Sequence, residues 1–443
     1  MAGGRSGRSC CGVLMGGELY TTFTFLGIAG WVYGRGAEIY YILAVGGGAY
    51  ILAYLYLPRL WRYAKERDLL TFADFFASRY GSKPFGAVTA LISTCTEALA
   101  LLLYLTGLQI ILTIAGLGAI DGTHAVLVAF GLITLFVFTA GLRGMAWASI
   151  VKDTLMLAGI AIAGFVLPIA FFGSPSAMLA HAIAARPQAF TIGAWTAGNG
   201  KLWYMSTAIL NVVGFFVGVN AVAATYSAKS EETVRRNAIL LPLYSVMLVP
   251  MFFAGYTAAL VLPGLHGTQS DSAYLRVLQA HFPLWLLGIV CAAGTLAGLL
   301  PSATRLLAAA SQLMKNVLDD IFNVATQGPA QTWVTRGFIV LIALVALLLW
   351  VYLKASLVDL LLFVYNGQAQ FVPGILFGLF WNRVSLVPVA IGLALGEIVA
   401  LGLTMHPLPL AGLNPGFAAL AINAATVVTL TLVRSKSHVR RVA

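Results

Sequence analysis

One apolar stretch near the start of the chain carries polar groups that could bind a solute or an ion. Residues 14–34 are long enough to cross a membrane, yet they contain Gly16, Glu18, Thr21 and Thr22. Lipid penalises such groups, so they need a protein-lined or wet cavity. Glycine beside a carboxylate also weakens a helix and frees backbone groups for a ligand. We expect a discontinuous helix here; the alternative is a packing helix whose hydroxyls bond to its own carbonyls.

A second interrupted stretch lies in the middle of the chain. Within the apolar run LWYMSTAILNVVGFFVGVNAVAATY stand Asn211, Gly214, Gly218 and Asn220. Many secondary transporters consist of two inverted five-helix repeats, and their sites are formed by discontinuous helices at corresponding positions. Counted from residue 14, this run is the sixth span, so it occupies the position that corresponds to the first. The pattern favours a binding site between two repeats; a glycine packing face with amides bonded across helices is the alternative.

The composition sets the class of protein in which these stretches must be placed. Hydrophobic residues make up 60% of the chain, charged residues 9%, and the mean hydropathy is +0.91, which excludes a soluble domain. The net charge of +11 is scattered over short loops, so it does not indicate nucleic-acid binding. Neither a metal-ligand spacing nor a nucleophile with its base is present in the sequence, so we expect neither an enzyme nor a metal or other cofactor.

Apolar runs near the roughly 20 residues that a membrane helix needs predict about twelve transmembrane helices. They fall at 14–33, 38–57, 83–117, 123–141, 146–172, 202–222, 237–262, 283–314, 335–353, 356–381, 384–404 and 412–434.

Basic residues gather in every second loop of this arrangement. One set of loops and the C-terminal tail hold Arg59, Arg62, Lys65, Arg67, Arg79, Arg143, Lys229, Arg235, Arg236, Lys315, Arg383, Arg434, Lys436, Arg440 and Arg441. The opposite loops hold only Arg35, Arg186, Lys201, Arg276 and Lys354. Because lysine and arginine favour cytoplasmic loops, we expect both termini in the cytoplasm of a cell that carries the protein in its inner or plasma membrane.

The same count divides the chain into parts. We expect a basic cytoplasmic N-terminus over 1–13, a first repeat over 14–172, an extracellular loop over 173–201, a second repeat over 202–381, and two further helices with a basic cytoplasmic tail over 382–443. Before the third helix, Thr71 and Asp74 form a helix-start signal for a short interfacial helix.

Five runs in this order resemble the sodium:solute symporter family, most of all its bacterial monocarboxylate and acetate-type permease branch. They are LTFADFFASRYGS, GLRGMAW, YSAKSEETVRRNAILLPLY, LLPSATRLLAAASQLMKNV and FVPGILFGLFWNRVS. The resemblance covers nearly the whole chain. It implies an all-α polytopic fold of the LeuT type, with two inverted five-helix repeats and two C-terminal helices. It also implies a symporter that moves a small organic solute by alternating access.

The start of the chain departs from the family pattern. Relatives usually begin with an additional helix and a complete first half of helix 1, whereas only residues 1–13 precede the expected break here. The chain therefore resembles an N-terminally truncated member. A transport-defective or solute-sensing protein of the same fold stays open as the alternative function.

The cation site that the resemblance implies is poor in oxygen ligands. Sodium-using members set helix 8 hydroxyls against helix 1 carbonyls, here near Gly16, with a helix 5 carboxylate close by. By resemblance the helix 8 hydroxyl positions fall on Leu300 and Pro301 or, with a small shift, on Ser302. The helix 5 carboxylate position falls on Ser149, and Lys152 and Arg305 lie nearby. A buried cation on a membrane helix is expensive and is usually paired or functional, so either could stand where sodium binds in relatives.

The same residues bear on the coupling ion, and the sequence allows either Na⁺ or H⁺. Lys152 could exchange a proton, or it could pair with Asp153 or extend to the interface. Arg305 could instead reach Glu97.

The solute site is expected between helices 1, 3, 6 and 10, where polar groups interrupt apolar spans. On helix 10 the run YNGQAQ either contacts solute or forms a hydrogen-bonded kink. The predicted solute-binding residues are Glu18, Thr21, Thr22, Tyr104, Asn211, Asn220 and Gln368. The resemblance suggests a monocarboxylate as solute. We expect the lipid bilayer to surround the protein. Whether a small accessory membrane subunit binds to it is left open by the sequence.

Overall fold

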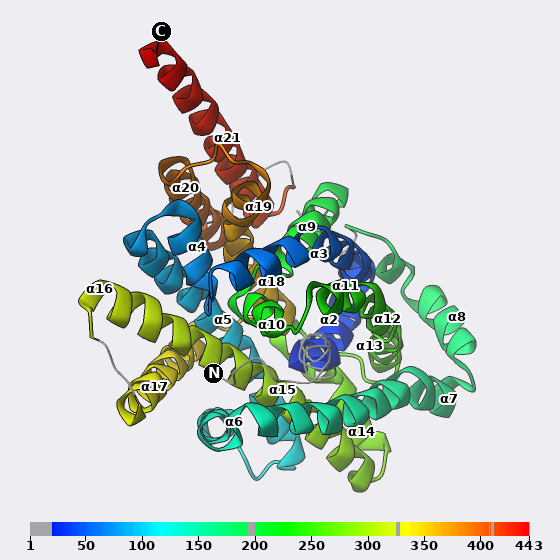
Figure 1. The fold of residues 1–443 in the computed structure, drawn as a ribbon. Helices are drawn as coiled ribbons and strands as arrows, with labels where there is room; N and C mark the ends of the chain where they lie inside the picture. The colour runs from blue at the N-terminus through cyan, green and yellow to red at the C-terminus, as the bar shows by residue number, and fades with distance from the viewer. Residues whose placement is uncertain (1–19, 194–199, 325–327, 407, 409–411, 443) are drawn as a thin grey trace.

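The fold is entirely helical in the part of the chain that the computed structural model describes (Figure 1). This part comprises residues 20–193, 200–324, 328–406, 408 and 412–442, with only the backbone described for 140–147, 244, 329 and 435–442. Ten stretches of it are long and apolar enough to cross a membrane. The predicted all-α polytopic class is confirmed, whereas the orientation of the termini stays a prediction.

The first half of the chain supplies the first five predicted spans. Its helices are η1 (Phe23–Gly27), α2 (Ile28–Arg35), η2 (Gly36–Tyr40), α3 (Tyr41–Glu66), α4 (Phe72–Tyr80), α5 (Lys83–Ala115), α6 (Gly122–Ala161), η3 (Ile162–Val166), α7 (Leu167–Phe172), α8 (Pro175–Ala185) and η4 (Pro187–Phe190). These observed helices differ from the predicted spans in two places. The predicted fourth helix and the start of the fifth form one continuous α6, and the first two predicted helices form one helical stretch of 44 residues, interrupted at Gly36.

The second half supplies the remaining spans. Its helices are α9 (Lys201–Gly214), α10 (Val219–Ser227), α11 (Glu231–Leu240), α12 (Pro242–Val246), α13 (Val249–Val261), η5 (Gly267–Ser272), α14 (Ala273–His281), α15 (Leu284–Gln312), η6 (Leu313–Asp319), α16 (Asp320–Phe322), α17 (Pro329–Tyr352), α18 (Leu357–Gln368), η7 (Ala369–Phe371), α19 (Val372–Phe380), α20 (Leu386–Met405) and α21 (Pro415–Val442). The predicted seventh span is divided among α11, α12 and α13, of which only α13 is strongly apolar.

The sixth span is broken where the sequence predicts. α9 ends at Gly214, and Gly218 has an extended backbone with φ −72° and ψ 155° before α10 begins. The side-chain amide of Gln368 donates to the carbonyl of Gly214 over 2.7 Å, so one backbone acceptor freed by the break is satisfied. A Cβ on Gly218 would lie 2.9 Å from the same amide. The break therefore depends on glycine and on a brace from α18.

The first helix in the described part of the first span is a π-helix. Residues Phe23–Gly27 form η1, which continues into α2, and every residue of η1 is buried. The glycines and Glu18 that predict the break lie before Tyr20, outside the described residues. α2 packs closely on α13, because a Cβ on Gly255 would lie 2.6 Å from the carbonyl oxygen of Ala29. Glycine at such contacts lets membrane helices approach closely.

The short helix α4 forms as predicted and ties two spans together. Thr71 and Asp74 form the reciprocal capping box at its start. Asp74 also accepts from Lys315 at 2.5 Å and from Asn316 at 2.7 Å, both on η6. Burial raises the pKa of Asp74, but Lys315 and the other donors outweigh it, so the pKa stays below its usual range. α4 is thus fastened to the end of the eighth span.

Helices α20 and α21 lie side by side (Figure 1), and they contact α18 and η7 through amide side chains. Asn366 donates to Thr404 at 3.0 Å, and Gln370 donates to the carbonyl of Gly416 at 3.2 Å. Asn423 donates to the carbonyl of Gln370 at 2.8 Å. Lipid cannot hydrogen-bond to polar groups, so these amide side chains and carbonyls satisfy one another instead.

A buried carboxylate joins three elements at the end of α2 that is predicted to be extracellular. Asp271 of η5 is 3% exposed, and its Oδ2 accepts from the backbone N–H of Leu357, the first residue of α18, over 2.8 Å. A Cβ on Gly30 of α2 would lie 2.6 Å from the Asp271 backbone. Burial raises the pKa of Asp271 from 3.8 to about 7; Asp359 adds to the rise, while the Leu357 N–H and Arg35 oppose it.

This pKa predicts a pH-dependent stability. The folded state holds the Asp271 proton more tightly than the unfolded chain does, so folding is unaffected below about pH 4, is penalised progressively up to about pH 7, and carries the full penalty above it. Three pKa units correspond to at most about 4 kcal/mol. We expect Asp271→Asn, which mimics the protonated acid, to melt at a higher temperature than the parent at pH 8 and at an equal temperature near pH 4.

The measurement is a melting curve in detergent at each pH. Asp68→Asn is the matched control, because Asp68 is exposed and its positive φ of 51° suits asparagine. A constant difference between parent and Asp271→Asn across this range would contradict the assignment.

Candidate functional site

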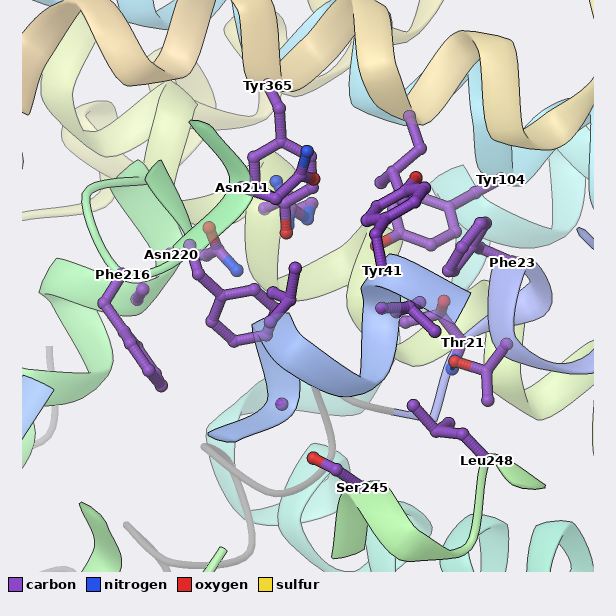
Figure 2. Close-up of a pocket in the computed structure, with 18 of the residues that line it drawn as sticks. Thr21, Phe23, Tyr41, Tyr104, Asn211, Phe216, Asn220, Ser245, Leu248 and Tyr365 are labelled. Carbon is purple, nitrogen blue, oxygen red and sulfur yellow. Dashed lines mark hydrogen bonds between the residues drawn. The ribbon is translucent and has the colours of Figure 1, made fainter. Parts of the chain in front are cut away.

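An internal cavity lies between the described start of the first span and the break in the sixth span (Figure 2). It is lined by η1 and the residues just before it, by α3, α5, α12, α15 and α18, and by both halves of the sixth span. Its volume is about 80 Å³, several times the roughly 10–15 Å³ that one water molecule needs. The cavity therefore suits a small solute.

Polar groups from several spans meet in this cavity. Four of the predicted solute-binding residues line it, namely Thr21, Tyr104, Asn211 and Asn220. Figure 2 shows the two asparagines on one side and Thr21 with Tyr104 on the other. Asn211 donates to the carbonyl of Thr207 in its own helix over 2.8 Å, which fixes the amide plane. Such convergent polar groups in an apolar wall orient a ligand.

Aromatic side chains make up much of the remaining wall, and the sequence analysis did not identify them. Phe215 and Phe216 come from the break itself, between Gly214 and Gly218. Phe215 stacks on Tyr365 with ring centroids 6.3 Å apart. The sequence signal that could have identified them is their position between two glycines, because side chains at a helix break can face a cavity.

Ser245 and Tyr41 complete the wall and were also missed. Ser245 stands on α12, and its buried hydroxyl has no hydrogen-bond partner among the described residues. It can reach the cavity because α3 has glycine opposite: a Cβ on Gly46 would lie 2.4 Å from Ser245. Tyr41 is the first residue of α3 and is 1% exposed.

Arg305, expected at the cation position, lines the solute cavity. Its Nη1 atom donates to Glu97 Oε2 of α5 over 2.8 Å, and the side chains are 15% and 3% exposed. Its guanidinium also lies 5.9 Å from the centre of the Tyr104 ring. A guanidinium can bind a carboxylate through two parallel hydrogen bonds. The cavity thus holds a cation next to its polar groups.

Two predicted solute residues lie outside the lining of this cavity. Thr22 faces α5 and α15, since a Cβ on Gly107 would lie 2.6 Å from it and one on Gly298 3.0 Å. Gln368 braces the broken helix through Gly214. Gly16 and Glu18 lie outside the described residues.

Lys152 occupies the region of the expected cation site. Its side chain is 1% exposed, and its Nζ atom donates to the carbonyl oxygen of Tyr20, just before η1, over 3.0 Å. The same nitrogen lies 3.0 Å from Asp153 Oδ1. Ser149 is buried on the same helix, and Ser302 donates its hydroxyl to the carbonyl of Gly298 in its own helix at 2.6 Å. An ammonium group therefore contacts a backbone carbonyl at the start of the described part of the first span.

A sixth span that is interrupted at a buried polar cavity, in an all-helical membrane fold, is typical of a secondary transporter of the inverted-repeat class. A solved Na⁺-coupled sialic acid symporter in a substrate-bound, outward-open state has the same fold, with a TM-score of 0.76 and 15% identity, over 96% of this chain and 89% of that one. The model of the sodium:solute symporter family matches residues 1–396, and the chain belongs to this family.

Named relatives are similar over nearly their full length. The uncharacterized symporter YhjB of Bacillus subtilis is 34% identical over 96% of this chain and 89% of its own. A monocarboxylate transport permease protein of Rhizobium johnstonii is 26% identical over 96% of this chain and 88% of its own.

Variants of the Arg305–Glu97 pair should separate the stability of the fold from the binding of the solute. Arg305→Met removes the charge that neutralises Glu97, and losing one partner of a buried pair costs about 3–5 kcal/mol. Adding Glu97→Gln removes the remaining buried charge, so we expect the double variant to regain most of its melting temperature but not its solute binding.

Both properties can be followed in melting curves recorded with and without solute. If the double variant recovers the solute-induced shift together with its stability, Arg305 has a structural role only.

Proposed function

We propose that this protein is a secondary active symporter that moves a small monocarboxylate across the inner or plasma membrane by alternating access. The observation that carries the proposal is the cavity of about 80 Å³ between the first span and the broken sixth span, with the Arg305 guanidinium in its wall. Its size limits the solute to a few heavy atoms, and the guanidinium, although paired with Glu97, offers N–H donors to a carboxylate.

The other lining groups support an anionic solute with a short carbon chain. Amides of Asn211 and Asn220 and the hydroxyls of Thr21 and Tyr104 can donate to carboxylate oxygens. Phe215 and Phe216 offer an apolar surface for a methyl or ethyl group. A relative named as a monocarboxylate transport permease is in accord with this solute class.

The Lys152 ammonium supports transport that does not need Na⁺. At about 4 Å, two unit charges repel each other by about 4 kcal/mol even at an effective dielectric of 20. A sodium ion that uses the Tyr20 carbonyl would come this close to the Lys152 nitrogen, which is 3.0 Å from that oxygen. We therefore propose coupling to H⁺, with Lys152 as the group that exchanges the proton.

Uptake into proteoliposomes tests the solute class. Labelled acetate, propionate, pyruvate, proline and a hexose are compared, and we expect saturable uptake of the monocarboxylates alone. Asn211→Ala and Asn220→Ala should each lower uptake at least tenfold. Asn382→Ala is the control, because Asn382 is an exposed loop residue. Saturable binding without uptake would indicate a sensor instead, and preference for proline or sugar would refute the monocarboxylate.

Ion replacement tests the coupling. We expect uptake at fixed pH to stay within twofold when choline replaces Na⁺, and to rise with an inward proton gradient. Lys152→Met should abolish the response to the gradient while the protein stays folded. A tenfold loss in choline, about 1.4 kcal/mol, would show that Na⁺ binds and that the Lys152 ammonium does not replace it.

A further inference from the structure

A second and much larger cavity lies at the other end of α2. Its volume is about 890 Å³, within the range of ligand pockets for molecules larger than the central cavity admits. Its wall is formed by α2, the segment between α13 and η5 with η5 itself, and the segment that joins α17 to α18. By the distribution of basic residues it faces the extracellular side.

Aromatic side chains separate the two cavities. Thr24 lines the central cavity and Gly34 the outer one, ten residues or about 15 Å apart along a helix axis. Between them Trp31 stacks on Trp203 with ring centroids 6.5 Å apart, and Tyr41 of the central cavity meets Trp203 edge-on at 6.2 Å. The outer cavity is therefore a site of its own and no extension of the central one.

Three permanently basic side chains from different segments line the outer cavity. They are Arg35 at the end of α2, Arg186 after α8, and Lys354 before α18. Arg186 donates to the carbonyl of Tyr33 over 3.1 Å, which holds its guanidinium at the wall. Arg35 and Lys354 lie over the rings of Trp31 and Trp350, at 4.1 and 3.4 Å. These contacts position the three basic groups along the cavity wall.

Acidic groups in the same wall offset the positive charge only in part. Asp359 lies 3.6 Å from Arg35. Asp271 is buried, and its pKa of about 7 leaves it partly protonated at neutral pH. Three cations thus face fewer than two full negative charges among the described lining residues. A concave surface with this balance of charge concentrates anions.

We propose that this outer cavity is a second binding site, which takes organic carboxylates from the extracellular side before a small one passes to the central cavity. The proposal rests on the proposed function for the passage inward, but binding at the outer site does not require transport. Arg186 and Lys354 bind the carboxylate, and Pro263 with Leu265 offers apolar surface to its carbon skeleton. The volume admits carboxylates that the central cavity excludes.

This difference in size supplies the probe. 2-Naphthoate is too large for a cavity of about 80 Å³ but fits one of about 890 Å³. We expect the purified full-length protein to bind one 2-naphthoate per chain in equilibrium dialysis, at an affinity that falls with ionic strength. The neutral analogue 2-naphthamide should bind at least tenfold more weakly.

Variants then locate the bound probe. Arg186→Gln with Lys354→Gln should weaken 2-naphthoate binding at least tenfold, while Arg186→Lys with Lys354→Arg keeps the charges and shows that the cavity still folds. Lys201→Gln is the matched control, because it removes a charge from the same side outside the cavity. Asn211→Ala in the central cavity should leave 2-naphthoate binding unchanged.

The outcomes separate this proposal from the proposed function. Unchanged binding in the double glutamine variant, loss of binding in Asn211→Ala, or equal binding of 2-naphthamide would each overturn the outer carboxylate site. Displacement of 2-naphthoate by chloride at equal concentration would overturn its selectivity for carboxylates. Absence of monocarboxylate uptake together with the expected binding pattern would instead overturn the proposed function and leave the outer site standing.

Discussion

The lack of water in a bilayer governs how this protein can form a site at all. A helix that unwinds in lipid exposes carbonyls and amides that no solvent can satisfy, so each break needs a partner from another span. In the sixth span the Gln368 amide supplies that partner for Gly214. At the first span the Lys152 ammonium donates to the carbonyl of Tyr20, the first described residue. In both places a polar side chain from another span satisfies a backbone acceptor near the cavity.

The two buried cations of the core are held in different ways. Lys152 contacts the carbonyl of Tyr20 in the first span and lies beside a neighbouring carboxylate, and its side chain is 1% exposed. Arg305 is neutralised by Glu97 from another helix and still reaches the cavity wall. The lysine is thus held by a backbone oxygen and an adjacent carboxylate, and the arginine by a carboxylate of a different span.

Much of this arrangement could be predicted from the sequence, and the limits have physical causes. Apolar length defines the spans, and Gly214 with Gly218 marks the break, because glycine and polar groups in an apolar run have few other uses. Polar type alone did not say which way a side chain points: Thr22 and Gln368 face neighbouring helices, while Asn211 and Asn220 line the cavity. The rotation of each helix about its axis decides which side chains face the cavity. A helix that is apolar on all sides gives no sequence pattern from which this rotation can be predicted.

The aromatic wall shows a second limit. With 25 phenylalanines and 17 tyrosines in the chain, an aromatic residue carries little positional information, and only its place beside the glycine break distinguished Phe215. Arg305 shows a third limit, since a long side chain can act several ångströms from its own backbone. Its expected place was the cation region, but its guanidinium reaches the solute cavity.

The amide bonds around helix 10 have a mechanical consequence. Gln368 holds the sixth span on one side, and Asn366 and Gln370 hold the last two helices on the other. Breaking any of these bonds during a transport cycle would strand polar groups in lipid. Hydrogen bonds therefore join the sixth span, α18 with η7, and the helices α20 and α21 into one connected set. A movement of α18 that keeps these bonds would carry both the broken sixth span and the last two helices with it.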